Sequence, residues 1–430
     1  MTALAVFLIV LIVLLLIGAP VATSFGLSSV IYILMQGVPV SIVAQRMFSA
    51  VDSLTIMCVP LFILAGELMA AGGIAKRLVR VINLIFGKAT GGLALVTVVV
   101  CAFFAALTGS AMACSVAIGS IMLPYMLEAG YDPKFSAAII AAAACLGPII
   151  PPSIPMIIYG VAMNLSIPAM FVAGVVPGIV IALALALVNI IFAYRNPEVI
   201  RYTKTMKFDF KLSLKLLWKA LGALGLPVLI LGGIYGGIFT PTESAAIGIV
   251  YALILGFALG ELKVRDLPRI LISSLKTSTM VNFIIAAASL FSWVVAKSQI
   301  GAVISEAFIN LVGGSQALYL FALVIILLIV GCLMDNVAAT LILAPILIPV
   351  GISLGCNELH IGMLFCICLV VGFVTPPFGY NLFTAISISG LNFKQIVKGS
   401  LPFLLTEIAL LFVFAYVPGI ITWLPRLMGY

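Results

Sequence analysis

Gly147-Pro148-Ile149-Ile150-Pro151-Pro152 and Gly372-Phe373-Val374-Thr375-Pro376-Pro377 decide the fold of this chain of 430 residues, because each is a helix-breaking segment within apolar sequence. Proline removes a backbone donor and frees carbonyl groups, and lipid offers no hydrogen bonds in exchange. The two segments lie 225 residues apart, with the glycine and both prolines in register. Paired helix breaks at corresponding positions of two halves point to the binding site of a secondary transporter.

The register extends beyond the two breaks. Residues 107–179 and 332–404 align at the same offset without a gap, and Gly174 matches Gly399. Four of the five prolines in the second window have a partner in the first, including Pro124 with Pro349 and Pro177 with Pro402. The sequence therefore predicts two structural repeats, each with one helix break.

Composition sets the class of protein. Apolar residues make up 64% of the chain and charged residues 8%, and most of the sequence divides into apolar runs. These runs are near the roughly 20 residues that span a bilayer, so we predict an all-α polytopic membrane protein. The net charge of +8 predicts no nucleic-acid partner, because the cations lie between the apolar segments rather than on one basic face.

The sequence lacks the motifs of enzymes and of transition-metal sites. H-E-x-x-H and the Walker loop are absent, and without a nucleotide-binding loop we expect uphill transport to use an ion gradient. The cysteines are expected as small buried hydrophobes, because Cys366 and Cys368 lack the spacing of a zinc or redox pair. The single histidine, His360, is expected at the surface. We predict a secondary active transporter without a cofactor.

Segment lengths predict the same order of elements in each half. The first half has spans near 4–18, 21–37 and 54–71, a re-entrant hairpin over 92–127 with Thr108-Gly109-Ser110 at its tip, a broken helix over 135–163 and a span over 168–194. The second half has spans near 221–239, 244–260 and 278–296, an amphipathic stretch over 297–316, a hairpin over 318–351 with Met334-Asp335-Asn336 near its tip, a broken helix over 361–389 and a span over 400–417.

These segments define the predicted domains. The first repeat covers 1–194, with scaffold helices over about 1–90 and the hairpin and broken helix over about 91–167. A basic linker follows over 195–219. The second repeat covers 220–430, with scaffold helices over about 220–316 and the hairpin and broken helix over about 317–390.

Charge distribution predicts the orientation. With both termini outside, 18 Lys and Arg residues lie inside and three lie outside, namely Arg46, Lys297 and Arg426. This bias follows the positive-inside rule and places the linker in the cytoplasm and both termini in the periplasm. Each half then crosses the membrane an odd number of times, so the two repeats are predicted to be inverted.

Acidic residues in apolar segments are candidates for function. Asp335 with Asn336 is interpreted either as a polar tip that orders ions or substrate or as a structural cap at the hairpin turn, and both interpretations stay open. Glu67 is expected to pair with Lys76 or Arg77. Glu243, after Thr240-Pro241, is expected to cap a helix. Glu407 has no partner that the sequence identifies.

The tips and breaks are stronger candidates than any single acid. Sodium is a hard cation that prefers several oxygen ligands, and freed carbonyls over 147–151 and 372–376 would supply them. The hydroxyls of Thr375, Thr108 and Ser110 would add more. Half-helices that begin after each Pro-Pro pair would direct positive dipoles toward an anionic substrate. The alternative is that the prolines only kink helices for packing.

Four motifs together resemble the large membrane subunit of tripartite ATP-independent periplasmic (TRAP) transporters, over the whole chain. They are Val59-Pro60-Leu61-Phe62-Ile63-Leu64-Ala65-Gly66-Glu67-Leu68-Met69, Ile150-Pro151-Pro152-Ser153-Ile154-Pro155, Phe239-Thr240-Pro241-Thr242-Glu243 and Thr375-Pro376-Pro377. The Pro-Pro element alone also suits related ion-coupled anion transporters.

The resemblance implies an elevator-type transporter in the bacterial inner membrane, in which a domain of hairpins and broken helices slides against a scaffold. It implies sodium as the coupling ion and a small organic acid delivered by a periplasmic binding protein. It also implies a small four-helix membrane subunit, expected as a separate chain because this sequence carries no extra module of that kind.

The resemblance also implies binding residues. One sodium site would use Thr108, Ser110, Gly147, Ile150 and Pro151, and the other Gly331, Gly372, Thr375 and Phe378, largely through carbonyl groups. Substrate would lie between the tips, near Ser153, Asp335, Asn336, Pro152 and Pro377. The family often carries a Ser-Gly-Ser-Ser tip, whereas this chain has Thr108-Gly109-Ser110-Ala111 and so lacks one hydroxyl.

Two other functions are carried as alternatives. One is a stand-alone ion-coupled anion transporter of the same architecture, which would need neither partner for uptake. The other is an intramembrane hydrolase that uses Asp335, although a second buried aspartate at comparable depth is missing from the sequence. A dicarboxylate, a keto acid, a sugar acid and a sialic acid are all compatible with the two tips.

Overall fold

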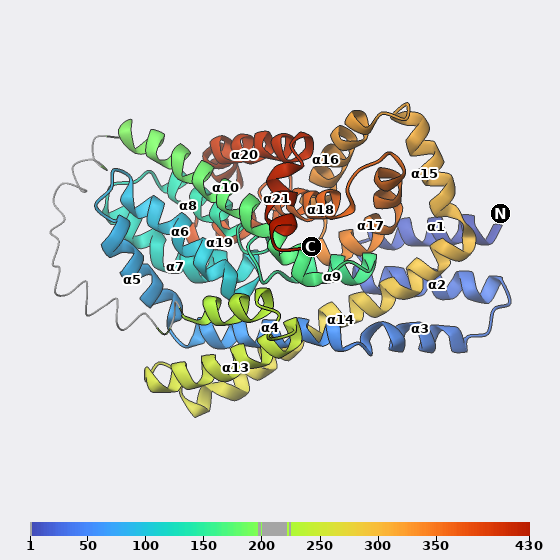
Figure 1. Cartoon of the computed structure of the whole chain (residues 1–430), viewed down its shortest axis with the longest axis horizontal. Coiled ribbons are helices and arrows are strands. Elements are labelled where there is room, and N and C mark those ends of the chain that lie inside the picture. The colour runs from blue at the N-terminus through green and yellow to red at the C-terminus, as the bar shows by residue number, and fades with distance from the viewer. Residues whose placement is uncertain (1, 197–198, 200–221, 223–224) are drawn as a thin grey trace.

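The computed structural model describes residues 2–196, 199, 222 and 225–430, and the regular elements in this part of the chain are all helices (Figure 1). Eight of its helices are long and apolar enough to cross a membrane. The all-α membrane architecture predicted from composition is therefore confirmed. Nearly all of the predicted basic linker over 195–219 lies outside the described residues.

Helices of the predicted scaffold come first in each half. In the first half they are α1 (Thr2–Leu16), α2 (Val21–Met35), α3 (Ser41–Val51), α4 (Leu54–Ala71) and α5 (Ile74–Phe86). In the second half they are an unnumbered helix over Gly225–Tyr235, α13 (Pro241–Ala258), the short η1 (Val264–Asp266), α14 (Leu267–Ser298) and α15 (Ile300–Leu311).

The hairpins and broken helices follow. In the first half they are α6 (Gly92–Thr108), α7 (Ala111–Glu128), α8 (Pro133–Ala144), α9 (Ile154–Met163) and then α10 (Ile167–Tyr194). In the second half they are α16 (Gln316–Leu333), α17 (Asn336–Ser353), α18 (Glu358–Gly372), α19 (Tyr380–Ser389) and α20 (Phe393–Tyr416), followed by α21 (Gly419–Leu427).

Helix boundaries recur at the offset seen in the prolines. α7 begins at Ala111 and α17 at Asn336, both are 18 residues long, and both starts are 225 residues apart. The cause is local, because Ser110 and Asp335 occupy the same N-cap position and each accepts a backbone hydrogen bond through its side chain. The two hairpins thus begin their second arms in the same way.

The breaks divide what would otherwise be single spans. α8 has 12 residues and α9 has 10, whereas α18 has 15 and α19 has 10. At about 1.5 Å per residue, none of them alone reaches across a hydrocarbon core of about 30 Å. Both Pro-Pro bonds, Pro151-Pro152 and Pro376-Pro377, are cis and lie between the half-helices. The broken helices predicted over 135–163 and 361–389 are therefore present.

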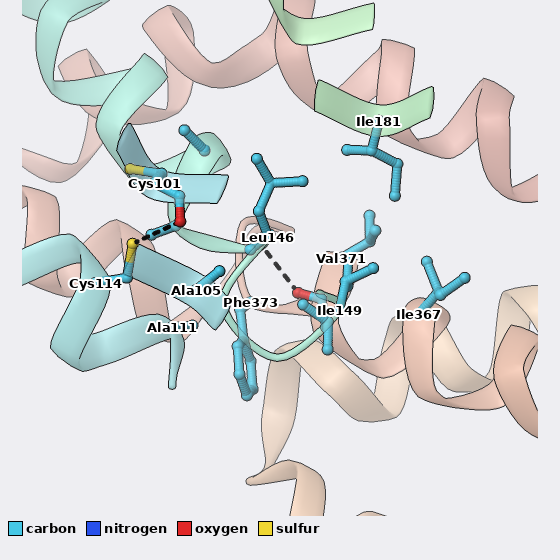
Figure 2. Packing of buried hydrophobic residues seen from close by; sticks show 14 of the residues in the cluster. Cys101, Ala105, Ala111, Cys114, Leu146, Ile149, Ile181, Ile367, Val371 and Phe373 are labelled. Carbon is cyan, nitrogen blue, oxygen red and sulfur yellow. Dashed lines mark hydrogen bonds between the residues drawn. The ribbon is translucent and has the colours of Figure 1, made fainter. Parts of the chain in front are cut away.

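The buried side chains form two clusters. The larger one joins the hairpins, both breaks, α4 and α5, and Figure 2 shows Leu146 and Ile149 of the first break beside Val371 and Phe373 of the second. The smaller cluster joins α1, α2 and α14 and includes a stack of Phe25 on Phe291 with ring centroids 4.8 Å apart. The hairpins therefore share a core that is largely separate from that of α1 and α2.

Several sequence predictions need correction. Three amphipathic or short helices, α3, α5 and α21, were not predicted. The span expected near 278–296 is only part of α14, which has 32 residues. The helix begins earlier, at Leu267, and Pro268 in its first turn favours a start there. The span expected from 400 belongs to α20, which begins at Phe393 because Asn392 and Gln395 form a capping box.

Two side-chain predictions are wrong. His360 is buried rather than at the surface, and its Nε2 lies 2.8 Å from the carbonyl oxygen of Phe414. Glu67 does not pair with Lys76 or Arg77 but accepts a hydrogen bond of 2.9 Å from the Ser273 hydroxyl. Arg77 instead contacts Glu261 at 3.7 Å. Helix packing decides these partners, and neighbouring positions in the sequence do not reveal it.

Candidate functional site

The first hairpin tip lies directly on the first helix break. α6 ends at Thr108, Gly109 has a φ of +59°, and Ser110 accepts a hydrogen bond of 3.4 Å from the backbone N–H of Ala113. A Cβ atom on Gly109 would lie 2.7 Å from the carbonyl oxygen of Pro152. Position 109 therefore requires glycine for two reasons, its left-handed backbone conformation and the close approach of the break.

A second close approach joins the tip to the start of the break. A Cβ atom on Gly147 would lie 2.8 Å from the carbonyl oxygen of Ser110, so these two predicted sodium-site residues touch through their main chains. The hydroxyl of Thr108 donates to the Phe104 carbonyl at 3.2 Å, which leaves its oxygen lone pairs available.

Backbone carbonyls of the first break complete this set of oxygens. Among the described residues, no hydrogen-bond donor reaches the carbonyl oxygens of Ile150 and Pro151. Ile150 is half-buried and Pro151 is buried, so water reaches these carbonyls poorly. Free carbonyl oxygens near a hydroxyl are the ligands that a hard cation prefers.

The second tip and the second break meet in a similar way. A Cβ atom on Gly372 would lie 2.5 Å from the carbonyl carbon of Gly331, and one on Gly331 would lie 2.5 Å from the carbonyl oxygen of Leu369. The backbone N–H of Gly379 also donates to the carbonyl of Cys332 at 3.3 Å. The predicted residues Gly331 and Gly372 are thus in direct main-chain contact.

Thr375 supplies a hydroxyl to this second junction. Its Oγ1 donates to the Val371 carbonyl at 3.0 Å, just as the Thr108 hydroxyl donates to the Phe104 carbonyl at the first junction. Within the described part of the chain, the carbonyl oxygens of Thr375 and Pro376 accept no hydrogen bond. Each junction therefore contains a threonine hydroxyl with free lone pairs and two unused carbonyls.

Asp335 caps the second arm of its hairpin. Its Oδ1 accepts a hydrogen bond of 2.8 Å from the backbone N–H of Val337, which the capping interpretation predicts. The side chain is nevertheless exposed and lines a cavity of about 210 Å³ at the second tip. Two further predicted site residues, Gly331 and Phe378, line the same cavity. The cap is present, and a contact with substrate stays a prediction.

Asn336 differs from its neighbour in burial. It is 2% exposed, and neither its Oδ1 nor its Nδ2 has a hydrogen-bond partner among the described residues. A buried amide without partners is costly and therefore marks a position where another polar group is expected. Asn336 thus remains a candidate for a contact with substrate or ion.

The other predicted substrate residues lie at the ends of the breaks. Ser153 is fully buried, caps α9 through a 3.4 Å bond from Met156 and donates to the Pro148 carbonyl. Pro152 is also buried, whereas Pro377 is exposed. The hydroxyl of Ser153 is therefore engaged in holding the first break, and the second break presents more surface than the first.

Sequence reasoning missed residues that the structure places at these junctions. Asn381 is fully buried and donates to the Ala141 carbonyl at 3.0 Å, so it ties the second half-helix α19 to α8 of the first repeat. Aromatic side chains also line the second-tip cavity, and three of them, Phe373, Tyr380 and Phe383, were not predicted. The density of aromatic residues after the second Pro-Pro pair was the signal that could have identified them.

The electrostatics of the junctions favour cations and the dipoles around them favour anions. No Lys or Arg lines the second-tip cavity in the described structure, while carbonyl and hydroxyl oxygens are abundant. The N-termini of α9 and α19 begin beside the breaks, where their dipoles carry partial positive charge. The geometry therefore suits bound cations next to an anionic ligand.

Comparisons with known proteins agree on the family. The model of the tripartite ATP-independent periplasmic transporter, DctM component, matches residues 8–420. The C4-dicarboxylate TRAP transporter large permease protein DctM of Rhodobacter capsulatus is 38% identical over 97% of this chain and 98% of its own length. The sialic acid TRAP transporter large permease protein SiaM of Vibrio cholerae is 31% identical over 96% of each.

A longer relative and a solved structure add to this picture. The isethionate TRAP transporter permease protein DctMQ of Oleidesulfovibrio alaskensis is 38% identical over 94% of this chain, which spans 64% of that relative. The crystal structure of the Alcanivorax borkumensis YdaH transporter has a TM-score of 0.62 and 15% identity, covering 87% of this chain and 86% of its own, and so supports the fold alone. The chain belongs to the DctM component family of tripartite ATP-independent periplasmic transporters, which are secondary-transporter large permeases and not enzymes.

Proposed function

We propose that this chain is the large permease subunit of a sodium-coupled importer for a small organic acid. Sodium would bind at the two junctions between a hairpin tip and a helix break, and the acid would bind between the tips. The observation that carries the proposal is the main-chain contact at each junction, Gly147 with Ser110 and Gly372 with Gly331. Such contacts gather backbone oxygens around a small space without any metal-binding side chain.

The two proposed sodium sites use hydroxyl and carbonyl oxygens of the residues predicted from the sequence. The first would take the hydroxyls of Thr108 and Ser110 and carbonyls of Gly147, Ile150 and Pro151. The second would take the Thr375 hydroxyl and carbonyls of Gly331, Gly372, Thr375 and Phe378. Support comes from the threonine hydroxyls at both junctions, which already donate to a helix carbonyl and so present only lone pairs.

We further propose that the two repeats are inverted and that the hairpins move as an elevator against the scaffold. The recurring boundaries of α7 and α17 support two repeats. An apolar cavity of about 420 Å³ lies between scaffold helices α4 and α14 and hairpin or half-helix elements α9 and α17. An apolar boundary of this kind has few hydrogen bonds to break when one side slides along the other.

Partners and orientation complete the proposal. A periplasmic binding protein would deliver the acid and a small four-helix membrane subunit would complete the scaffold, in the bacterial inner membrane with both termini periplasmic. The relatives are named for C4-dicarboxylate, isethionate, sialic acid and 2,3-diketo-L-gulonate, which supports a small organic acid without selecting one. A stand-alone anion transporter is the second candidate, and the requirement for partners separates the two.

The first test compares thermal unfolding of the purified chain, with and without the small subunit, in sodium and in potassium at equal ionic strength. A ligand at 100 times its dissociation constant stabilises by about 2.7 kcal/mol, which gives a clear shift of the midpoint. We expect a saturable shift in sodium alone. Equal midpoints in the two salts, with the small subunit present, would contradict the sodium sites.

The second test measures uptake into proteoliposomes. With an inward sodium gradient, a panel of organic acids would be offered to vesicles that contain the chain alone, the chain with the small subunit, or both with the binding protein. We expect uptake only in the complete system. Uptake by the chain alone would instead favour the stand-alone transporter.

A further inference from the structure

The motif over residues 59–69, in scaffold helix α4, has no part in the two proposed sodium sites. Within this motif Gly66 is buried and touches the tip of the first hairpin. A Cβ atom on Gly66 would lie 3.2 Å from the Cα atom of Thr108 and 3.5 Å from its Cβ and Cγ2 atoms. A scaffold helix therefore meets the hairpin at a residue of the first proposed sodium site, with no side chain of α4 between them.

The close approach accounts for a glycine at position 66. Gly66 lies in the interior of α4, where glycine is less favourable than alanine. Its φ does not lie in the left-handed region, so the backbone conformation alone would admit alanine. What opposes a side chain at this position is the contact with Thr108, because an added methyl group would be packed too tightly against it.

The same contact helps to orient the Thr108 hydroxyl. The Cγ2 methyl of Thr108 lies against Gly66, while the hydroxyl donates to the Phe104 carbonyl of its own helix at 3.2 Å. Both groups branch from one Cβ atom, so the contact and the hydrogen bond together select one rotamer. The lone pairs of the hydroxyl then have a fixed direction, which preorganises an ion ligand.

Helix α4 is itself fixed by the scaffold helices α13 and α14 beside it (Figure 1). The Thr242 hydroxyl of α13, in the motif over residues 239–243, donates to the Leu54 carbonyl at 2.8 Å. The Ser273 hydroxyl of α14 donates to Glu67, the residue after Gly66, at 2.9 Å. These two bonds hold α4 at its first residue and beside Gly66, so the hairpin alone does not set the position of this helix.

The second junction differs at the corresponding position. Leu333 follows Thr108 by the repeat offset of 225 residues, and it is 57% exposed, whereas Thr108 is 4% exposed. Leucine has no hydroxyl, and the hydroxyl of the second junction belongs to Thr375 of the break. The side chain at this position of the tip is therefore covered at the first junction and open at the second.

We propose that Gly66 is a positioning residue for the first sodium site, and that α4 is the wall against which Thr108 is held. The inference rests on the proposed function, because it assumes a sodium ion at this junction. Gly66 does not bind the ion. The absence of a side chain at position 66 sets the position of Thr108, whose hydroxyl is the ligand. The affinity of the first site then depends on a contact between scaffold and hairpin as well as on the hairpin itself.

Sodium titrations of the unfolding midpoint test this role. Gly66→Ala should raise the apparent dissociation constant for sodium by about tenfold, because Thr108 must shift to admit the methyl group. Gly26→Ala is the matched control, since Gly26 lies within α2 and no atom lies within 4 Å of a Cβ there. If Gly66→Ala lowers the midpoint equally in sodium and potassium and leaves the dissociation constant unchanged, the contact is only structural and the inference is wrong.

A double-mutant cycle isolates the contact between the two residues. Thr108→Ser removes the Cγ2 methyl and keeps the hydroxyl. In that background Gly66→Ala should raise the sodium dissociation constant by a smaller factor than in the wild type, because one of the atoms that the new methyl meets is absent. Equal factors in the two backgrounds would show that positions 66 and 108 act independently, which contradicts the proposal.

Ser273→Ala tests the same wall without adding an atom, and it decides the matter if Gly66→Ala does not fold. Loss of the bond to Glu67 should raise the sodium dissociation constant. Ser298→Ala is the control, because the Ser298 hydroxyl donates to the Val295 carbonyl within α14. An unchanged constant in Ser273→Ala would then overturn the inference.

The wild type separates this inference from the proposed function. A wild-type protein without any sodium-dependent shift would overturn the sodium sites and with them the role of Gly66. A wild-type shift that Gly66→Ala leaves unchanged would overturn the role of Gly66 alone.

Discussion

The thiol of Cys145 donates a hydrogen bond to the carbonyl oxygen of Val370 at 3.5 Å, and the two residues are 225 positions apart. This spacing is the offset between the repeats, so a residue of the first repeat contacts its own counterpart in the second. Two equivalent positions can touch only near the axis that relates the repeats. For the two repeats proposed above, the contact places that axis between the first residue after α8 and the last turn of α18, at the centre of the two junctions.

The Gly331–Gly372 contact gives the first prediction. Gly372→Ala should lower the unfolding midpoint and abolish the sodium-dependent part of the shift, because the new Cβ would lie 2.5 Å from the Gly331 carbonyl carbon. Overpacking of this kind costs about 1–3 kcal/mol. Differential scanning fluorimetry in sodium and potassium measures both effects. Gly419→Ala is the matched control, since no atom lies within 4 Å of a Cβ there; equal behaviour of the two variants would contradict the site.

The Thr375 hydroxyl gives a second prediction. Thr375→Val should weaken the apparent sodium affinity by about tenfold, corresponding to the loss of one ligand of about 1.4 kcal/mol, while Thr375→Ser should restore it. Thr277→Val is the control, because the Thr277 hydroxyl makes the same kind of bond to a helix carbonyl at an exposed position of α14. Sodium titrations of unfolding midpoints distinguish the variants. An unchanged affinity in Thr375→Val would show that the hydroxyl is not a ligand.

Two substitutions of Asp335 can separate its role as a helix cap from a role in binding substrate or ions. Asp335→Ala should destabilise the protein by about 0.5–2 kcal/mol through loss of the N-cap, whereas Asp335→Asn keeps an acceptor for the Val337 N–H and should be nearly as stable as the wild type. Uptake kinetics of Asp335→Asn then report on binding alone. We expect an altered KM for the acid, and a KM equal to that of the wild type would leave only the structural cap.

Gly109, at the tip of the first hairpin, gives a prediction about the contact between tip and break. Gly109→Ala should impair folding and uptake, because position 109 has a φ of +59° and its Cβ would lie 2.7 Å from the Pro152 carbonyl oxygen. Gly37→Ala is the matched control, with a φ of +66° but nothing within 4 Å. The difference between the two unfolding midpoints isolates the contact with the break from the backbone strain. No difference would mean that tip and break do not need to touch.

The order of the helices was predictable because it depends on local chemistry. α8 ends just before Gly147 and α18 ends at Gly372, the glycines that begin the two breaks. Ser110 and Asp335 start the second arms of the hairpins, so these boundaries follow from the sequence itself. The partners of buried side chains were not predictable in this way. His360 and Glu67 find their partners 54 and 206 residues away, across helix interfaces that no local pattern encodes.

The residues of the candidate site also fall into a predictable and an unpredictable group. Gly147 and Gly372 were predicted from the repeat and Gly331 from the family resemblance, and all three bring main chains into contact. Asn381 was missed, because its equivalent in the first repeat is Met156 and the offset therefore offers no signal. The rotation of α19 about its axis decides that Asn381 faces α8, and this rotation depends on packing rather than on composition.

The glycine contacts at the junctions have a consequence for how such a protein can diverge. Oxygens of the main chain are present whatever side chain a position carries, so substitution elsewhere leaves the proposed ion ligands unchanged. Under the proposed function, side chains that line the second-tip cavity, such as Phe378 and Tyr380, would instead vary with the cargo. The proposed function thus assigns selectivity for the acid and the energy source for its uptake to different parts of the polypeptide, so that one would be inherited while the other is replaced.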